Sequence, residues 1–411
     1  MIEMTTPEPT PLDPFTATED GARHERYDAL TASGSMHWIQ FPGGSHGWLI
    51  TSYDVARWAL TDPRFSKGGP GQAPFQDRLP ARVIAATDHH LLNLDPPDHT
   101  RLRRLLSAAF TRRRSEQLAP RIQELTDDLL DGLDRRFAAN DGPVDLIAEF
   151  AYPLPIAVIC ELLGIPEADQ GDFRAWTGPL VNISFSGFDA YEHAVTAMVD
   201  YMHDLLARKR REPGDDLLSA LIAVRDQGDQ LTEDELLSMV FLLLIAGHET
   251  TVNLIANGVR ALLTHPDQWG LLRREPERMG SAVEELLRYD GPLQTAIPTV
   301  TTAPVEIDGI QVPAGELVVV SLLAANRDPK RLPDAEKLDV TRPEMSHLAF
   351  GHGIHRCVGA PLAQVEGRIA LGSLIRRFER LELAVPAADL VRTPGMLMNS
   401  LVTLPVRLSA G

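Results

Sequence analysis

The chain has 411 residues, of which 44% are hydrophobic, and a formal net charge of −18. This size and composition permit a large buried core, and length alone would suggest two or three domains. The negative charge argues against non-specific binding to nucleic acid or to an anionic membrane. Since the sequence has no uncharged apolar run of about 18 residues, we expect no transmembrane helix.

The first twenty residues are rich in proline, threonine and acidic residues. They have neither the basic start nor the apolar stretch of a signal peptide. We therefore expect residues 1–20 to form a flexible tail. The two cysteines, Cys160 and Cys357, are too few for a disulfide framework and suit a reducing cytoplasm.

Helical periodicity dominates the rest of the chain. A β-prone run begins at Trp48 and is followed by amphipathic segments at residues 100–110, 121–137, 192–211 and 233–263. Cys160 falls in an apolar run and is interpreted as a core residue. Strand-like alternation follows at residues 305–310, 316–322 and 401–408. The pattern predicts a mainly α protein with small β-sheets.

A basic segment lies near residue 100. His99 and Arg103 are spaced at i and i+4, which places them on one face of a helix. Their ordinary interpretation is an exposed histidine and a surface arginine. Residues 101–114 contain six arginines and no acid. Such a cluster is either a solvated basic face or a docking surface for an acidic protein.

The longest predicted helix, residues 233–263, would span roughly 45 Å. It opens on a capping box, Thr232-x-x-Glu235. Its apolar middle is interrupted at residues 247–251 by Gly-His-Glu-Thr-Thr, and polar groups there are costly unless they are used. The alternative is that the threonine hydroxyls bond back to the preceding turn. His248 could face a bound substrate, but we interpret it as a packed or solvated histidine.

Glycines surround the second cysteine in residues 350–359, Phe-Gly-His-Gly-Ile-His-Arg-Cys-Val-Gly. They allow positive φ and close approach of the backbone to a flat ligand. A thiolate in such a turn can accept backbone N–H bonds and bind a metal. Cys357 could instead be a small buried hydrophobe, or a nucleophile with His355 or His352 as base.

The pattern Phe-Gly-x-Gly-x-His-x-Cys-x-Gly resembles the haem-thiolate loop of the cytochrome P450 monooxygenases. The resemblance runs from about Trp48 to the end of the chain, with matching motifs in the expected order. It implies the prism-shaped, mainly α fold of that family, with haem between the long central helix and the helix after the cysteine loop. We therefore expect residues 21–411 to form a single catalytic domain.

The resemblance also implies roles for individual residues. Cys357 would be the axial thiolate ligand of iron in haem b. Residues 246–251 match the family's oxygen-activation motif, so Thr250 would hydrogen-bond to bound dioxygen and Glu249 would relay protons from solvent. The propionates would be bound by His99, Arg103 and His355. The other implied haem contacts are Phe350, Gly351, Ala246 and Gly247.

Two further motifs concern the support of the haem. Glu285 and Arg288 match the family's buried Glu-x-x-Arg pair, which Arg342 would complete as a structural triad; Leu338 stands where the family has phenylalanine. In contrast, Thr299 stands where the family has a propionate-binding arginine. That departure leaves the propionates to the three residues above.

On this resemblance the protein is a monooxygenase that hydroxylates or epoxidises a largely hydrophobic small molecule. The sequence is most similar in kind to actinobacterial enzymes of secondary-metabolite and antibiotic biosynthesis, which act on macrolides, polyketides or terpenoids. We expect a monomeric, cytoplasmic enzyme. O₂ is the co-substrate, and NAD(P)H acts only indirectly, through a reductase and a ferredoxin that docks on the basic face. The implied substrate pocket comprises Leu91, Leu92, Ile183, Leu243, Leu293, Ala296, Ile297 and Leu397.

Two other functions are compatible with these motifs. One is a haem-thiolate sensor or ligand-binding protein without oxygen turnover, which the presence of both Glu249 and Thr250 argues against. The other is a non-haem enzyme with Cys357 as nucleophile.

Overall fold

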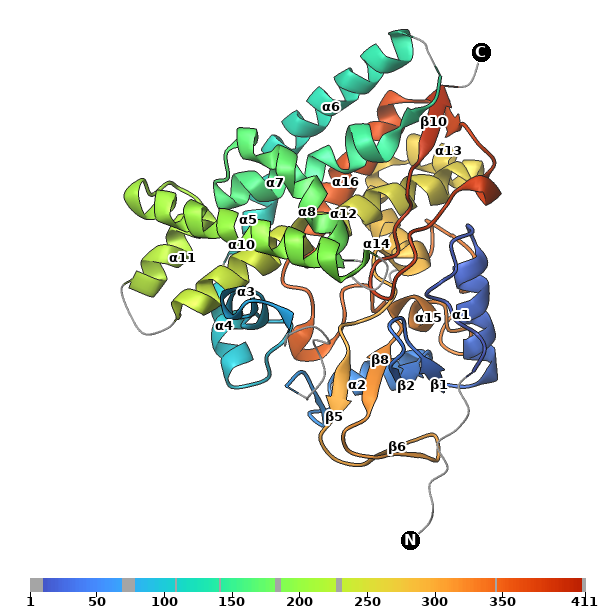
Figure 1. Cartoon of the computed structure of the whole chain (residues 1–411). Helices are drawn as coiled ribbons and strands as arrows, with labels where there is room; N and C mark the ends of the chain where they lie inside the picture. The colour runs from blue at the N-terminus through green and yellow to red at the C-terminus, as the bar shows by residue number, and fades with distance from the viewer. Residues whose placement is uncertain are drawn as a thin grey trace.

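The computed structural model shows a mainly helical protein with small sheets; most labelled strands lie at the lower end of the view, and β10 lies near the top (Figure 1). The structure describes residues 10–68, 78–107, 109–139, 142–181, 186–226, 231–343 and 346–408. The predicted fold class is confirmed. That residues 21–411 form one catalytic domain stays a prediction.

The predicted long helices are all present, with shifted ends except for the longest, whose bounds agree. The helices in the described ranges are α1 (Ala22–Ser33), α2 (Tyr53–Ala59), α3 (Ala81–Asp88), α4 (Asp98–Ser107), α5 (Arg112–Gln117), α6 (Ala119–Ala139), α7 (Pro153–Leu163), α8 (Phe173–Val181), α10 (Phe188–Arg211), α11 (Leu217–Asp226), α12 (Glu233–Leu263), α13 (Pro266–Arg274), α14 (Met279–Asp290), α15 (Leu322–Asn326) and α16 (Ala360–Arg377).

The strands of the described ranges form three sheets. The largest has the order β1-β2-β8-β5-β3, with β2 and β8 parallel and the other pairs antiparallel. A second has the order β4-β10-β9, and β6 and β7 form a hairpin. Their bounds are β1 (Met36–Gln40), β2 (His46–Ile50), β3 (Phe65–Ser66), β4 (Val144–Asp145), β5 (Thr299–Thr301), β6 (Val305–Ile307), β7 (Ile310–Val312), β8 (Leu317–Val320), β9 (Leu381–Leu383) and β10 (Pro405–Leu408).

The central helix α12 organises the helical part, packing against α3, α7, α14 and α16. Its capping box is formed: the Thr232 hydroxyl accepts from Glu235 N, and the Glu235 carboxylate accepts from Thr232 N. By length and composition α12 could cross a membrane, but 67% of its most apolar window is buried inside the protein. That burial is typical of a core helix.

The predicted Glu285–Arg288–Arg342 triad is formed next to α14. Arg288 donates two hydrogen bonds to the Glu285 carboxylate at 2.7 and 2.8 Å, and Arg342 donates to it at 3.3 Å. Arg288 also donates to the carbonyls of Asn326 and Ala335. The triad therefore ties α14 to the segment that leads into the cysteine loop.

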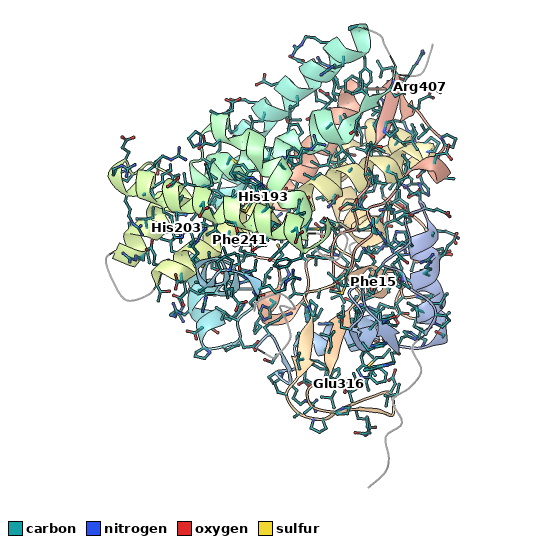
Figure 2. All side chains as sticks on the ribbon, viewed as in Figure 1. Phe15, His193, His203, Phe241, Glu316 and Arg407 are labelled. Carbon is teal, nitrogen blue, oxygen red and sulfur yellow. The ribbon has the colours of Figure 1, made fainter. Side chains whose placement is uncertain are left out.

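The expectation of a flexible tail is wrong for residues 10–20. Phe15 (Figure 2) is fully buried against Tyr27 and Phe41. Asp20 forms ion pairs with Arg260 of α12 and with Arg392. Composition predicted a tail, but one aromatic anchor and one buried carboxylate attach this segment to the core. Residues 1–9 lie outside the described residues.

Candidate functional site

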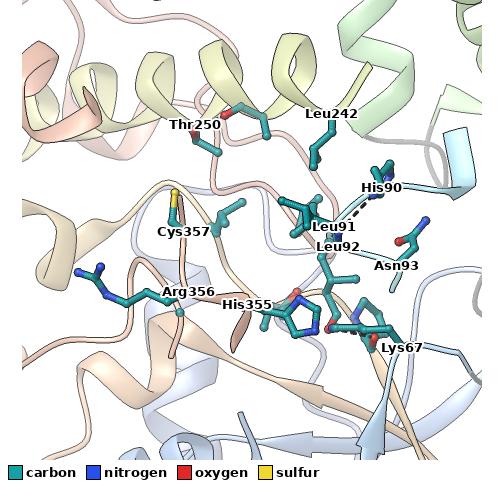
Figure 3. Close-up of a pocket in the computed structure, with 18 of the residues that line it drawn as sticks. Lys67, His90, Leu91, Leu92, Asn93, Leu242, Thr250, His355, Arg356 and Cys357 are labelled. Atoms are coloured by element: carbon teal, nitrogen blue, oxygen red, sulfur yellow. Dashed lines mark hydrogen bonds between the residues drawn. The ribbon is translucent and has the colours of Figure 1, made fainter. Parts of the chain in front are cut away.

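A cavity of about 1350 Å³ lies between α12 and the loop that precedes α16. It exceeds the roughly 300–1,000 Å³ of ordinary ligand pockets. Figure 3 shows Thr250 of α12 facing Cys357 across it. The cavity can therefore hold a large cofactor together with a substrate.

Nearly all the predicted site residues line this cavity. Glu249 is described but is not part of the lining, and Ile183 lies outside the described residues. The lining includes Leu91, Leu92, His99, Arg103, Leu243, Ala246, Gly247, Thr250, Leu293, Ala296, Ile297, Phe350, Gly351, His355, Cys357 and Leu397.

Two glycines with positive φ shape the cysteine loop. Gly351 has φ 68° and Gly353 has φ 71°. A Cβ atom at Gly353 would lie 2.5 Å from the carbonyl oxygen of Leu60, a contact that only glycine avoids. The Cys357 N–H donates to the Phe350 carbonyl at 2.8 Å and closes the loop. The loop thus presents the sulfur at the start of α16.

The Cys357 sulfur faces the cavity. Its side chain is accessible from there, while surrounding protein atoms desolvate the thiolate and raise the pKa of the thiol. The N–H groups of Gly359 and Ala360 and the charge of Arg103 act in the opposite direction. A bound metal cation would complete the stabilisation of the thiolate. Cys160 is buried in α7, as predicted.

Cationic and imidazole groups gather on one wall of the cavity. The rings of His99 and His355 lie 4.4 Å apart. Both ring nitrogens of His99, and Nδ1 of His355, are buried without a hydrogen-bond partner. Burial, followed by the positive charge of Arg103, lowers the pKa of His99. For His355, burial and the nearby Lys67 lower the pKa to about 4. Asp95, which also lines the cavity, accepts hydrogen bonds from the Ser66 hydroxyl and from the backbone N–H of Lys67 instead of from these imidazoles.

On the opposite wall α12 contributes Ala246, Gly247 and Thr250. The Thr250 hydroxyl donates to the Ala246 carbonyl at 2.8 Å, so the bond to the preceding turn is formed. Its oxygen retains acceptor capacity toward the cavity. A Cβ atom at Gly247 would lie 2.8 Å from Cδ1 of Ile159, so glycine also permits close packing of α7.

Glu249 lies beside Thr250 in sequence but contacts a different neighbourhood. Its carboxylate lies 3.4 Å from Nε2 of His248. Burial opposes its ionisation, but the hydrogen bond to His248 and the charges of His248 and Arg174 prevail, so its pKa is lowered. His248 is fully buried, and its ring packs edge-on against Tyr152. In the structure it is therefore a packed histidine. Glu249 is thus held ionised behind the cavity wall.

Sequence reasoning missed two charged residues of the lining. Glu366 of α16 is 1% exposed, and one of its carboxylate oxygens has no partner. Burial raises its pKa well above the usual value and so favours the protonated form. Lys67 contacts residues 230 positions away in the chain, so no local pattern revealed it.

Comparison with known proteins agrees with this geometry. The model of the family described as Cytochrome P450 matches residues 184–402. The chain belongs to the cytochrome P450 family. It is 45% identical to cytochrome P450 monooxygenase PikC of Streptomyces venezuelae, over 99% of this chain and 96% of that protein. It is 41% identical to the mycinamicin IV hydroxylase/epoxidase of Micromonospora griseorubida, over 98% and 100% of the two chains.

Solved structures show the same relationship. The tirandamycin C-bound P450 monooxygenase TamI superposes with a TM-score of 0.87 at 44% identity, covering 95% of this chain and 98% of that chain. As a P450 monooxygenase, the protein uses haem iron with a cysteine thiolate ligand, O₂, and electrons from redox partners. The residues present fit that cofactor. Cys357 faces the cavity, and the unpartnered nitrogens of His99 and His355 suit its carboxylates.

The nucleophile alternative finds no support in this geometry. His352 accepts a hydrogen bond from Arg57 at 3.3 Å, and His355 packs on His99. Within the described ranges, neither histidine hydrogen-bonds the Cys357 thiol. A general base must reach the proton that it abstracts.

Gly353→Ala should destabilise the cysteine loop and lower the haem content of the purified protein. Gly309→Ala is the matched control, because Gly309 also has positive φ but nothing lies within 4 Å of its added Cβ. The control should lose only the roughly 1–2 kcal/mol that a left-handed residue costs. Urea unfolding and haem content measure both effects. Equal losses in the two variants would show that the Leu60 carbonyl moves aside.

Proposed function

We propose that this protein hydroxylates or epoxidises a largely hydrophobic secondary metabolite, with one atom of O₂ entering the product. The observation that carries this proposal is the arrangement of Cys357 opposite Thr250, beside a wall where ring nitrogens of His99 and His355 have no hydrogen-bond partner. Haem, when bound, supplies the oxygen-activating chemistry. The residues of this chain hold it, exclude water and position the substrate.

We assign the haem contacts by position. Cys357 would hold the iron through its thiolate, and Phe350 and Gly351 of the same loop would contact the haem. Ala246 and Gly247 of α12 line the other side of the cavity and would contact the haem there. The other three contacts face the propionates, since a buried carboxylate requires cationic or N–H partners; they are His99, Arg103 and His355.

The substrate region is apolar. Leu91 and Leu92 come from the segment before α4, Leu243 from α12, and Leu397 from the chain beyond β9. Leu293, Ala296 and Ile297 complete this part of the lining. Apolar walls select a ligand mainly by shape and by buried area. The names of the relatives, which include a hydroxylase/epoxidase, support both reaction types and give no support to the sensor alternative.

Thr250 and Glu249 divide the proton chemistry. The Thr250 proton is committed to the Ala246 carbonyl, so its oxygen presents lone pairs that can hold a proton-donating water in the cavity. Glu249 is ionised and partly exposed. A carboxylate in that state can accept protons from solvent and pass them along α12.

The electron donor docks on the side of α5. Arg112, Arg113 and Arg114 are exposed, and α5 packs against α16, with Arg368 of α16 paired to Glu116. Arg101 does not belong to this surface, because it pairs with Asp98 and Glu235. An acidic ferredoxin has complementary charge. We also propose that the enzyme is monomeric and cytoplasmic.

The purified protein should show the CO-difference spectrum of a haem thiolate and should form product with O₂ and a redox system. Cys357→Ala should abolish both the thiolate-type spectrum and product formation, because the thiolate is the electron-donating axial ligand. Cys160→Ala, which removes the buried cysteine of α7, should retain both. An unchanged spectrum in Cys357→Ala would disprove the assignment.

Thr250→Ala should bind haem and substrate normally but waste reducing equivalents as peroxide. We expect product formed per NADPH to fall by roughly tenfold or more, because the variant lacks the oxygen that holds the proton-donating water. A positioned proton donor contributes about 10²–10⁴ in rate. Thr250→Ser keeps the hydroxyl and should remain coupled. Product, peroxide and NADPH consumption are measured together. Full coupling in Thr250→Ala would assign proton delivery to another group.

Reversing the charges of Arg112, Arg113 and Arg114 to glutamate should raise the apparent KM for ferredoxin. The effect should shrink as salt rises, because exposed charges are screened over about 10 Å at 0.1 M. The single variant Arg113→Glu is also measured. Arg211→Glu, at the exposed end of α10, is its control, because it reverses one exposed charge elsewhere. The apparent KM for ferredoxin is measured by electron-transfer kinetics at two ionic strengths. Substrate binding is measured in parallel and should not change. Equal responses at the two sites would leave α5 an ordinary solvated surface.

A further inference from the structure

Lys67 is a buried lysine on the cavity wall, directly after β3. Its side chain belongs to a residue that is only 8% exposed. Nζ donates to the carbonyl oxygens of Ile297 at 2.5 Å and Pro298 at 3.2 Å. An ammonium carries three N–H donors, so one donor remains. Lys67 lines the cavity, and its head group is fixed rather than free to extend into solvent.

Within the described ranges no carboxylate forms an ion pair with Lys67. The charge of Asp95 acts on Lys67 and raises the pKa of the ammonium. The Asp95 Oδ2 atom, however, accepts from the backbone N–H of Lys67 and from the Ser66 hydroxyl instead of from Nζ. Burial lowers the pKa of Lys67 to about 8, and Asp95 offsets only part of that effect. A buried ammonium without an anion is costly. The wall therefore has room for a negatively charged ligand.

Lys67 shares this wall with the groups already assigned to the propionates. Figure 3 shows it next to His355, and its charge is the second largest influence on the pKa of that ring. Asp95 also links the Lys67 backbone to the start of α4, which carries His99 and Arg103. Three separate segments thus bring positive or N–H groups to one place.

Thr299 is the position where the family pattern has an arginine. It lines the cavity, but its hydroxyl donates to the Val318 carbonyl at 3.1 Å and it carries no charge. Ile297 and Pro298, whose carbonyls hold the Lys67 ammonium, are the two residues directly before it. The ammonium therefore lies at the entry to the same strand, β5.

We propose that Lys67 is a haem-carboxylate ligand of this protein and replaces the arginine that Thr299 lacks. The proposal rests on the haem binding assigned above. Lys67 supplies one N–H bond and one positive charge to a propionate, and the propionate supplies the anion that the buried ammonium lacks. Lys67 is therefore a cofactor-binding residue. In place of a cation at position 299 on β5, the chain has one directly after the neighbouring strand β3.

The test replaces Lys67 by methionine and follows haem retention. Haem should transfer from Lys67→Met to apomyoglobin about tenfold to a hundredfold faster than from the unmodified protein, the range for one lost charge-assisted hydrogen bond. The reduction potential should become more negative, because a nearby positive charge favours ferrous over ferric haem. The CO spectrum should stay of the thiolate type, which separates a failure here from a failure of the Cys357 assignment. Lys330→Met, an exposed lysine, is the charge-matched control and should change neither haem transfer nor potential.

The decisive variant is Lys67→Met combined with Thr299→Arg. If Lys67 replaces the missing arginine, the double variant should regain slow haem transfer and a less negative potential. The apoprotein of Lys67→Met should unfold at the same or a higher urea concentration, since its buried charge lacks an anion without haem. Unchanged haem transfer and potential in Lys67→Met would overturn the proposal. So would a loss of haem that follows an equal loss of apoprotein stability, because Lys67 would then only fasten the Ile297 and Pro298 carbonyls.

Discussion

The compensation of charge in a desolvated cavity is the constraint on which this structure depends. A thiolate and two carboxylates must be brought into the interior, and each is unfavourable there without a partner. For the thiolate, the protein provides two backbone N–H groups and the charge of Arg103. For the carboxylates, we propose that partners come from a wall of cationic and imidazole groups in which ring nitrogens of His99 and His355 are unpartnered. Cofactor and protein are therefore complementary in charge as well as in shape.

The fold serves this constraint by making the two sides of the cavity rigid. On one side, α12 is buried along most of its length and begins at a formed capping box. On the other, the Glu285–Arg288–Arg342 triad anchors the segment before the cysteine loop through buried hydrogen bonds. Breaking such a buried pair leaves an uncompensated charge, so the support of the loop is intolerant of change. The substrate region, lined by leucines, carries no comparable constraint and is free to vary with the ligand.

Charge also separates the inner and outer faces of the basic segment. Of its arginines, Arg103 faces the cavity and Arg101 pairs with Glu235 at the start of α12, whereas those of α5 stay exposed. One run of like charges in the sequence is therefore divided between the cavity, a structural ion pair and the exposed surface. Helical geometry decides this division, because residues two or three positions apart point in different directions.

The sequence by itself determined the features that are local in the chain. The glycine pattern around Cys357, the capping box at Thr232 and the polar interruption of α12 are short-range signals, and each was found where it was predicted. The family resemblance added the Arg342 contact and selected His99 and Arg103 of α4, which both line the cavity. Tertiary structure alone decided the rest. Phe15 and Asp20 pack residues 10–20 into the core, and the Glu249 carboxylate contacts His248 instead of lining the cavity. Lys67 donates to carbonyls 230 and 231 positions away. Such contacts depend on which surfaces the folded chain brings together, and no periodicity or spacing encodes them.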